Sequence, residues 1–503
     1  MNRIEDLLKK NRYTFTYTDD TETLKGDVLY SHSLRYMSYL SKNGVTNDDR
    51  VIVMSDKCSD FIIAVFAVLS LGAIVVPVSD QASYDIILEI IDITRPACIC
   101  VSGENIDKKL AFNSTENMKV IPINRCDFEN LKQVELSTIL SDESIAFILM
   151  SSGTTGRRKG IALTHRAVIS NIQAIVDYMK PVQSDHFLSL KNFVHVSTLV
   201  GEILTCIYAG AHLYLPNPIC PMAKTLKNIE TFAPTLLFGN PQILLRLMQY
   251  AKKNSADIAV KTIYTSGAIF KQAEAKELSE TFQNSQIRNV YGLTEAGPRV
   301  AAQSEKDCDK YGSVGKPIKD TYIYIKDVKG ETTQRESRTN EIGIVCIKNK
   351  SLMLGYVHSG FQISYINREE YFETGDLGYI DEEGNLFIVG RANDIINVSG
   401  NNVNPNLVEE RIVMLAGISD CITFGVPDQV YGSRLICLIV EGSRSISERE
   451  LIQHCNRYLY SYERPKEYIL CESIPVNEYH KKSRYWLSQQ YQNGLLKSNK
   501  LTF

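Results

Sequence analysis

The sequence predicts an α/β protein with a large N-terminal domain, an antiparallel barrel-like part and a small α+β C-terminal domain. From residue 50 onward, short apolar segments alternate with amphipathic segments, a pattern typical of parallel sheets with helices on their faces. Past about residue 310 the apolar segments become short and are separated by turns, which indicates antiparallel strands. A second change of composition begins at Asp394. A chain of 503 residues is also too long for one hydrophobic core.

The alternation begins with strands expected at 51–54, 73–78 and 97–101 and helices expected at 61–72 and 84–94. We expect Ser59 or Asp60 to cap the first of these helices. The stretch 61–78 is apolar enough to be weighed as a membrane span, but Gly72 and Pro77 interrupt it. A buried helix followed by a core strand is therefore the favoured interpretation.

The later elements follow the same logic. The alternation resumes with helices expected at 167–179 and 242–250 and strands at 211–215 and 235–238. The antiparallel part is expected to have strands at 322–325, 343–347 and 378–380 and a solvated loop at 328–341. The C-terminal unit is expected to have helices at 405–415 and 447–459 and strands near 420–425 and 435–441. We place the domain boundary between residues 393 and 394, which gives domains of residues 1–393 and 394–503.

The overall composition excludes several classes of protein. The net charge is −3, which gives no reason to expect a nucleic-acid partner. Residues 1–8 carry acidic side chains and no apolar core, so we do not expect a signal peptide. The 12 cysteines form no Cys-x-x-Cys pair, which is typical of reduced, buried thiols. We therefore expect a cytoplasmic protein without a transmembrane segment, and a homodimer is left open.

A glycine-rich stretch follows the apolar run 145–150 and reads Ser151-Ser152-Gly153-Thr154-Thr155-Gly156-Arg157-Arg158-Lys159-Gly160. Its glycines let backbone N–H groups approach an anion, its hydroxyls donate hydrogen bonds, and its cations supply charge. It lacks the Gly-Lys-Ser/Thr ending of a Walker loop. Taken alone, the stretch indicates either a polyphosphate cradle or a solvated surface turn and does not separate the two.

Further motifs follow this stretch in a fixed order. They are Thr164-His165-Arg166, Phe193-Val194-His195 with Gly201, Ser266-Gly267-Ala268, Asn289-Val290-Tyr291-Gly292-Leu293-Thr294-Glu295, Gly312 to Pro317, Thr374-Gly375-Asp376, Gly390-Arg391 with Asp394, and Ser399-Gly400. With these motifs the sequence resembles the adenylate-forming superfamily of acyl-CoA synthetases, peptide-synthetase adenylation domains and luciferases, from about residue 25 to about residue 485. The resemblance implies a large AMP-binding domain of two α/β sheets with a small barrel-like part. It also implies a small mobile C-terminal domain that carries the catalytic lysine.

The resemblance implies a reaction in which a carboxylate attacks the α-phosphorus of ATP, giving an acyl-adenylate and pyrophosphate. Two anions must meet, so the site has to neutralise charge as it develops. The implied nucleotide-binding residues are Ser151, Ser152, Gly153, Thr154, Thr155, Gly156, Lys159, Gly267, Ala268, Asn289, Tyr291, Gly292, Asp376 and Arg391.

Within this set, the residues have different implied roles. The Thr154–Lys159 loop is expected on the β- and γ-phosphates, Tyr291 on the adenine ring, and Asp376 on the ribose hydroxyls. Glu295 is expected to bind Mg²⁺, which a single carboxylate can do together with phosphate oxygens. The expected catalytic residues are Thr294, Glu295, His195 and Lys481. Taken singly, Tyr291 suits a plain core residue and Glu295 a solvated acid, so these roles depend on the motif series.

The position of the catalytic lysine comes from the family pattern of Pro, about five residues, and then Gly-Lys. The matching stretch begins at Pro475, and it places Lys481 at the lysine position and Arg484 at a further matching position. His480 replaces the usual Gly, and Lys482 replaces an apolar residue. Lys482 is therefore a competing candidate for the same role.

The glycine-rich loop departs from the family pattern at Arg158, where a proline normally precedes the lysine that is Lys159 here. We expect this change to lower the rigidity of the loop and to raise the positive charge near pyrophosphate. The resemblance also implies that the C-terminal domain rotates about Asp394 between adenylation and thioester formation.

The class of acid substrate is limited by His195. This residue occupies the position where α-amino-acid activators have an Asp that pairs with the substrate ammonium. A histidine provides no such anchor, which favours a fatty, aryl or other carboxylic acid; alternatively, His195 is a pocket-wall residue. The pocket candidates are His195, Val196, Val200, Gly239, Ser266, Gly267, Pro298 and Val300.

The acceptor is expected to be CoA, with the phosphopantetheine thiol of a separate carrier protein as the alternative. Two other classes stay open. A kinase or ATPase would release ADP or phosphate instead of AMP. A degenerate adenylate-binding protein would bind ATP without catalysing exchange.

Overall fold

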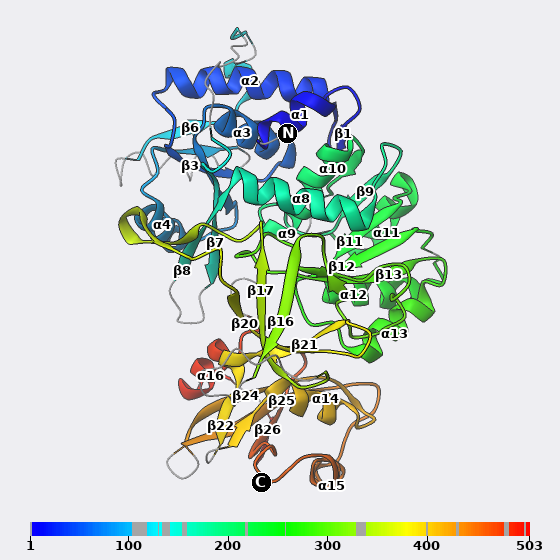
Figure 1. Cartoon of the computed structure of the whole chain (residues 1–503). Helices are drawn as coiled ribbons and strands as arrows, with labels where there is room; N and C mark the ends of the chain where they lie inside the picture. Colours follow the sequence, from blue (N-terminus) through cyan, green and yellow to red (C-terminus); the bar gives the residue numbers. More distant parts are fainter. Residues whose placement is uncertain are drawn as a thin grey trace.

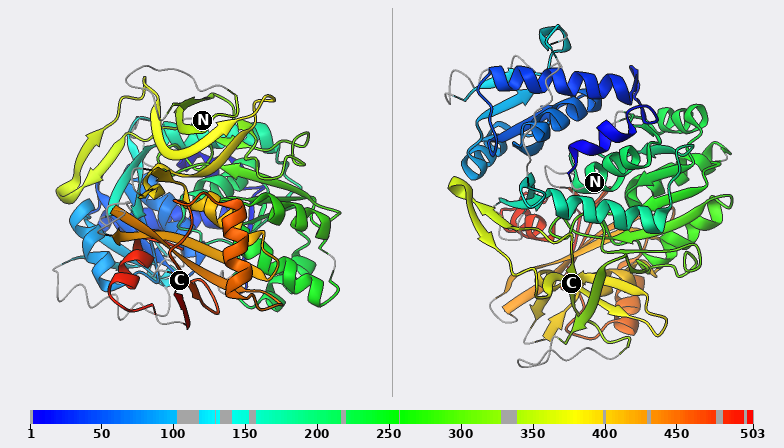
Figure 2. Two further views of the ribbon diagram at one scale, coloured as in Figure 1. Left: turned by 90° about the horizontal axis from the view of Figure 1, so that it is seen from below. Right: turned by 45° about the horizontal axis from the view of Figure 1, so that its top comes forward.

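The computed structural model describes residues 3–102, 118–128, 130–132, 141–152, 158–216, 220–256, 258–327, 339–398, 401–428, 432–476, 482–496 and 499–502. Two large sheets make up most of the N-terminal part, and the C-terminal part lies below them in Figure 1 and in the right view of Figure 2. Among the described residues, no helix is long and apolar enough to cross a membrane.

The first sheet has the described strand order β19-β18-β8-β7-β4-β3-β5-β6. Strands β7, β4, β3, β5 and β6 run parallel. Beyond them each strand is antiparallel to its neighbour: β8 to β7, β18 to β8, and β19 to β18. The strands are β3 (Arg50–Ser55), β4 (Ile74–Ser79), β5 (Cys98–Val101), β6 (Val120–Pro122), β7 (Ile145–Ser152), β8 (Arg158–Thr164), β18 (Gly355–His358) and β19 (Gln362–Tyr365). The glycine-rich stretch thus enters from β7 and leaves along β8.

The helices associated with this sheet include the two that the sequence predicts at 61–72 and 84–94. They are α2 (Gly26–Lys42), α3 (Cys58–Ser70), α4 (Tyr84–Thr94) and the short α7 (Arg125–Phe128). Helix α4 has its predicted bounds. It begins at Tyr84 because the N-cap Ser83 accepts a hydrogen bond from the backbone N–H of Ile86. Helix α3 begins earlier than predicted. Its N-cap is Lys57, and Asp60 instead pairs with Arg125 at 2.9 Å.

The second sheet has the described order β15-β14-β13-β12-β11-β9-β10-β1-β2. Its strands are β1 (Thr16–Thr18), β2 (Thr23–Lys25), β9 (His186–Ser189), β10 (His212–Tyr214), β11 (Leu236–Gly239), β12 (Thr262–Thr265), β13 (Gln286–Tyr291), β14 (Ala301–Ala302) and β15 (Lys316–Pro317). Strands β11, β12 and β13 are parallel and in register, with Gly239 opposite Thr265 and Thr265 opposite Asn289. Their carboxyl ends therefore meet at one edge, which is where ligands bind in open α/β sheets.

The helices associated with this sheet include the two that are expected at 167–179 and 242–250, which are α8 and α12. They are α1 (Glu5–Asn11), α8 (His165–Met179), α9 (Val196–Thr198), the π-helix η1 (Leu199–Leu204), α10 (Thr205–Ala209), α11 (Met222–Phe232), α12 (Pro241–Lys253) and α13 (Gln272–Thr281). Helix α12 starts at Pro241 because Asn240 caps it and proline suits the first turn.

The antiparallel part expected after residue 310 is a sheet in the order β16-β17-β20-β21, drawn in yellow-green to yellow in Figure 1. Its strands are β16 (Thr321–Lys326), β17 (Gly343–Asn349), β20 (Phe372–Ile380) and β21 (Leu386–Arg391), and the short 3₁₀ turn η2 (Ser359–Phe361) lies between β18 and β19. The pairing of β20 with β21 sets Asp376 opposite Arg391. Residues 328–338 of the loop expected here lie outside the described part of the chain.

The C-terminal part follows the 3₁₀ turn η3 (Ala392–Asp394), and the boundary at residue 393 stays a prediction. Its described elements are β22 (Ile396–Val398), β23 (Asn401–Val403), α14 (Pro405–Val413), β24 (Ile418–Asp428), β25 (Gly432–Glu441), α15 (Glu448–Tyr458), β26 (Glu467–Leu470), α16 (Arg484–Gln492) and β27 (Asn499–Thr502). Strands β24 to β27 form one sheet, whose two faces carry separate apolar clusters.

Candidate active site

A cleft of about 1030 Å³ lies between the large N-terminal part and the C-terminal part. Its walls come from the ends of β12 and β13, from β20 and β21, and from the start of α16. Among the predicted nucleotide-binding residues, the cleft is lined by Gly267, Ala268, Asn289, Tyr291, Gly292, Asp376 and Arg391. The structure therefore brings together residues that are separated by up to 124 positions in the sequence.

Asp376 is the centre of a polar network in this cleft. The Tyr291 hydroxyl donates to Asp376 Oδ2 at 2.5 Å, and Arg391 Nε lies 3.0 Å from Asp376 Oδ1. The backbone N–H of Asp376 donates to the Thr374 hydroxyl at 3.0 Å. Burial raises the pKa of Asp376, and Arg391 and the Tyr291 hydroxyl oppose that effect. A buried carboxylate held in this way is suited to accept hydrogen bonds from a diol.

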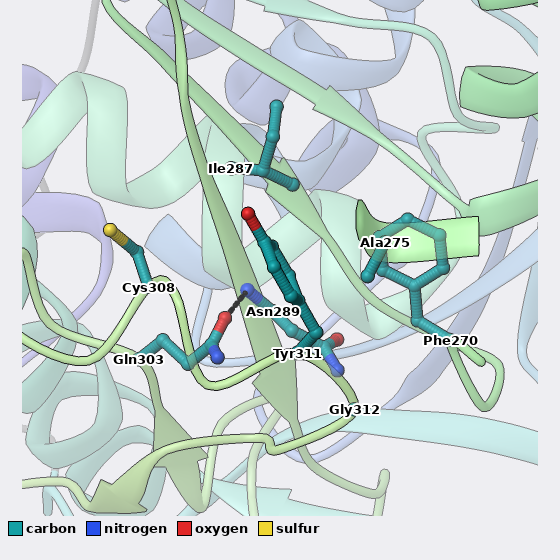
Figure 3. A pocket seen from close by; sticks show the side chains of 8 residues that line it. All are labelled: Phe270, Ala275, Ile287, Asn289, Gln303, Cys308, Tyr311 and Gly312. Carbon is teal, nitrogen blue, oxygen red and sulfur yellow. Dashed lines mark hydrogen bonds between the residues drawn. The ribbon is translucent and has the colours of Figure 1, made fainter. Parts of the chain in front are cut away.

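Asn289, one of the predicted nucleotide-binding residues, lies in β13 and lines the cleft. Its backbone N–H donates to Gln303 Oε1 at 2.7 Å, and its side-chain amide nitrogen donates to the Ser313 carbonyl at 3.0 Å. Behind it, a pocket of about 10 Å³ is closed by the rings of Tyr311 and Phe270 (Figure 3). Such a volume holds at most one water, so this pocket supports Asn289 rather than binding a ligand.

Gly292 follows Tyr291 at the end of β13. A Cβ at this position would lie 2.1 Å from the carbonyl oxygen of Pro298, so any larger residue would displace the backbone. The loop from 292 to 300 therefore folds back tightly on itself and carries Thr294 and Glu295 at its bend.

Glu295 and Lys159 lie on either side of Tyr356. The Tyr356 hydroxyl donates to Glu295 Oε1 at 3.3 Å, and Lys159 Nζ lies 5.2 Å from the centre of the Tyr356 ring. Burial raises the pKa of Glu295. We did not predict Tyr356 as a site residue, because no motif around residue 356 pointed to it.

Glu295 fits the Mg²⁺ that the resemblance implies. Its carboxylate accepts one long hydrogen bond from a side chain and keeps further lone pairs for a cation. Among the described residues, no group of three or more His, Cys, Asp or Glu side chains could hold a metal ion. Mg²⁺ usually takes one or two protein carboxylates together with phosphate and water oxygens, and Glu295 is the residue that would hold it.

Residues 153–157 of the glycine-rich loop lie outside the described part of the chain. At its edges Ser151 pairs with Lys159 and Ser152 with Arg158 in the β7–β8 ladder. Arg158, which replaces the usual proline, is held by Glu89 of α4: the backbone N–H of Arg158 donates to Glu89 Oε1 at 3.0 Å. Its Nε lies 3.0 Å from Glu89 Oε2. Glu89 was not predicted.

Most residues predicted for the acyl pocket do not line the cleft, unlike the predicted nucleotide-binding residues named above. Of its candidates, only Gly267 lines the cleft. Val200, Pro298 and Val300 are buried, His195 is exposed at the N-cap of α9, and Val196 is the first residue of that helix. Gly239 ends β11, and Ser266 and Gly267 directly follow β12. Ser266 joins a buried polar cluster that the sequence did not predict.

The C-terminal part contributes its own side chains to the cleft. Lys481 lies outside the described residues, while Lys482 lines the cleft and pairs with Asp420 at 2.5 Å. Arg484 Nη1 lies 3.1 Å from the expected hinge residue Asp394, and Arg484 Nη2 lies 2.9 Å from both carboxylate oxygens of Glu409.

Comparison with known proteins agrees with this geometry. Residues 8–357 match the family model described as AMP-binding enzyme, and residues 407–481 match the AMP-binding enzyme C-terminal domain. The chain therefore belongs to the AMP-binding enzyme family, within the adenylate-forming superfamily.

The relatives and solved structures extend over nearly the whole chain. The chain is 27% identical over 490 residues to a long-chain-fatty-acid–CoA ligase of Bacillus subtilis, covering 89% of this chain and 86% of the relative. It is 25% identical over 475 residues to a 2-succinylbenzoate–CoA ligase of Oceanobacillus iheyensis, covering 92% and 93%. The structure of ATP-bound MatB from Rhodopseudomonas palustris shares the fold, with a TM-score of 0.86 at 21% identity and coverage of 98% and 99%.

Proposed function

We propose that the chain is an ATP-dependent acid–thiol ligase. It activates a carboxylic acid as an acyl-adenylate, releases pyrophosphate, and then transfers the acyl group to a thiol. The observation that carries this proposal is the Tyr291–Asp376–Arg391 network, which lines a cleft closed on its other side by the C-terminal part. A nucleoside diol at Asp376 directs the phosphates along the cleft toward β8 and the glycine-rich loop.

Each group has a distinct task in the first half-reaction. Asp376 accepts hydrogen bonds from the ribose, and Tyr291 provides a flat face for the base. Lys159 and the loop residues of 151–156 bind the pyrophosphate end, while Lys481 stabilises the charge that develops at the α-phosphorus. Mg²⁺, when bound through Glu295, would neutralise phosphate charge. Thr294 and His195 stay candidates for positioning the acid.

CoA is the proposed acceptor, since both relatives named above are CoA ligases and the chain covers most of each of them. The proposed acid is a fatty, aryl or related carboxylic acid. After adenylation the C-terminal part rotates about Asp394, which removes Lys481 and admits the thiol. Loading of a separate carrier protein is the alternative that an acceptor assay distinguishes.

The decisive experiment is acid-dependent exchange of labelled pyrophosphate into ATP, over a panel of fatty, aryl and amino acids, followed by addition of CoA. We expect exchange with one acid class and release of AMP rather than ADP. Asp376→Asn should lower the rate by about 10- to 100-fold, because charge-assisted bonds to the ribose are lost. Asp177→Asn, an exposed change on α8, is the matched control. ADP as the product, or no exchange with any acid, would contradict the proposal.

A further inference from the structure

A buried polar cluster lies directly behind the end of β12. We use this name for Lys191, Ser197, Glu202, Ser266 and Arg299, which come from four separate segments of the chain. Lys191 Nζ donates to Ser197 Oγ at 2.8 Å and to Ser266 Oγ at 3.0 Å, and it pairs with Glu202 at 2.5 Å. Arg299 Nη1 donates to Ser197 Oγ at 3.0 Å, and its Nη2 lies 3.8 Å from Glu202.

The cluster buries more positive than negative charge. The exposed fraction of the side chain is 10% for Lys191, 2% for Arg299 and 0% for Glu202. Two cations thus share one carboxylate in a nearly dry environment, where an uncompensated charge is strongly unfavourable. Burial accordingly lowers the pKa of Lys191, although Glu202 opposes that effect. A further anion would be favoured beside these groups.

The local backbone is built around this cluster. Glu202 lies in the π-helix η1. Single π-turns are rare in proteins, and those that occur are often found at functional sites. Its neighbour Gly201 leaves room for Arg299, because a Cβ there would lie 2.9 Å from Arg299 Nη2. The segment is therefore shaped to seat a charged side chain next to the residues that the sequence predicts for the acid pocket.

A hydrogen-bond count shows which group is left to meet a ligand. Ser197 Oγ accepts from both Lys191 and Arg299, so its own hydrogen donates to Ser266, 3.1 Å away. Ser266 Oγ then accepts from Lys191 and Ser197, and its own hydrogen remains available. Within the described part of the chain, no acceptor for that hydrogen is found. Ser266 immediately precedes Gly267, which lines the cleft.

We propose that the polar cluster binds a second carboxylate on the acid substrate, so that the substrate is a short dicarboxylic acid. The inference rests on the proposed function and narrows its substrate class. The distal carboxylate accepts from the Ser266 hydroxyl and lies close to the excess positive charge of Lys191 and Arg299. A long apolar tail would instead have to pack against two buried cations.

The test compares acids of matched length in the pyrophosphate exchange assay: pentanoate against glutarate, hexanoate against adipate, and decanoate as a long apolar acid. We expect the full-length protein to prefer the dicarboxylate of each pair by about 10-fold or more in kcat/KM. Lys191→Met and Ser266→Ala should each lower the ratio of kcat/KM for the dicarboxylate to kcat/KM for the monocarboxylate toward one. The KM for ATP should stay unchanged. Lys253→Met, on the exposed face of α12, is the control.

The outcomes separate this inference from the proposed function. Exchange that is equal or better with the monocarboxylates, or a preference that survives Lys191→Met, would overturn the dicarboxylate site and leave the ligase proposal standing. If Lys191→Met fails to fold, Ser266→Ala, which removes a single oxygen, carries the same test. No exchange with any acid by protein that binds ATP would overturn both proposals.

Discussion

Arg484 contacts several groups within the C-terminal part, and its removal gives a sharp prediction. Its guanidinium contacts both oxygens of Glu409 at 2.9 Å, Asp394 at 3.1 Å, and the Thr423 carbonyl at 3.0 Å. Arg484→Met leaves the buried Glu409 carboxylate without its main counter-charge. Breaking a buried pair in this way costs about 3–5 kcal/mol of unfolding free energy, and the Thr423 N–H that still donates to Glu409 favours the lower end.

The pH dependence of this loss has a definite sign. Burial already raises the pKa of Glu409, and Arg484 opposes the rise, so the variant should raise that pKa further. A carboxyl group whose pKa is raised by folding contributes stability at low pH, and this is lost as the pH rises through the folded-state pKa. The difference between variant and parent should therefore be largest at neutral pH and shrink in acid.

Denaturation in urea measures both effects, with the fluorescence of Trp486 as the signal. This is the single tryptophan of the chain and lies two residues from Arg484 in α16, so it reports on the C-terminal part. The double change with Glu409→Gln should recover a large share of the loss, because no unpaired charge remains. Arg457→Met on the exposed face of α15 is the control and should change stability by less than about 0.5 kcal/mol. A loss for Arg484→Met below about 1 kcal/mol, or one that is equal at acidic and neutral pH, would refute the reasoning.

Four further predictions concern catalysis. Arg158→Pro removes both the N–H and the cation that Glu89 holds, and we expect the KM for ATP to rise about 10-fold. Glu89→Gln, which keeps a hydrogen-bond acceptor, should give a smaller rise. An unchanged KM in both variants would contradict a role for the Glu89–Arg158 pair in ATP binding. Glu295→Gln should lower exchange by about 10²-fold and raise the Mg²⁺ concentration needed for half-maximal rate. Because burial raises the pKa of both Glu295 and Asp376, the parent protein should lose exchange activity on acidification at a pH above the ordinary carboxyl range, and a pH profile checks this. Lys481→Ala should abolish acid-dependent exchange yet spare thiol transfer from supplied acyl-adenylate, and equal loss of the two steps would argue against the assignment.

Local chemistry explains which elements the sequence could predict. Helix α4 matched its predicted bounds because an amphipathic run and a serine cap coincide there, and α12 began one residue from its predicted start at an Asn-Pro pair. Helix α3 began earlier than predicted, since its acidic residue Asp60 is used for an ion pair with Arg125, 65 positions along the chain. Caps are local, whereas such pairs depend on the fold.

The same distinction divides the candidate site. The nucleotide-binding residues could be proposed from the sequence because each sits in a short motif, and the structure places three of them, Tyr291, Asp376 and Arg391, in contact. Glu89 and the buried polar cluster carry no motif, and their partners come from distant segments. Lys191 and Arg299, in particular, meet only because β9, η1 and the loop after β13 converge on one edge of the second sheet.

The close approach of Gly292 to Pro298 has a consequence for attempts to change the acid that this protein uses. Glu295, a predicted nucleotide-side residue, and Arg299, part of the proposed acid site, belong to the loop from 292 to 300, whose two ends that contact holds together, and Tyr291 directly precedes this loop. Exchanging the acid-side half of the loop for that of a relative would therefore shift the nucleotide half with it. New selectivity is better sought by single changes at Lys191 or Ser266, which lie on other segments and leave this loop intact.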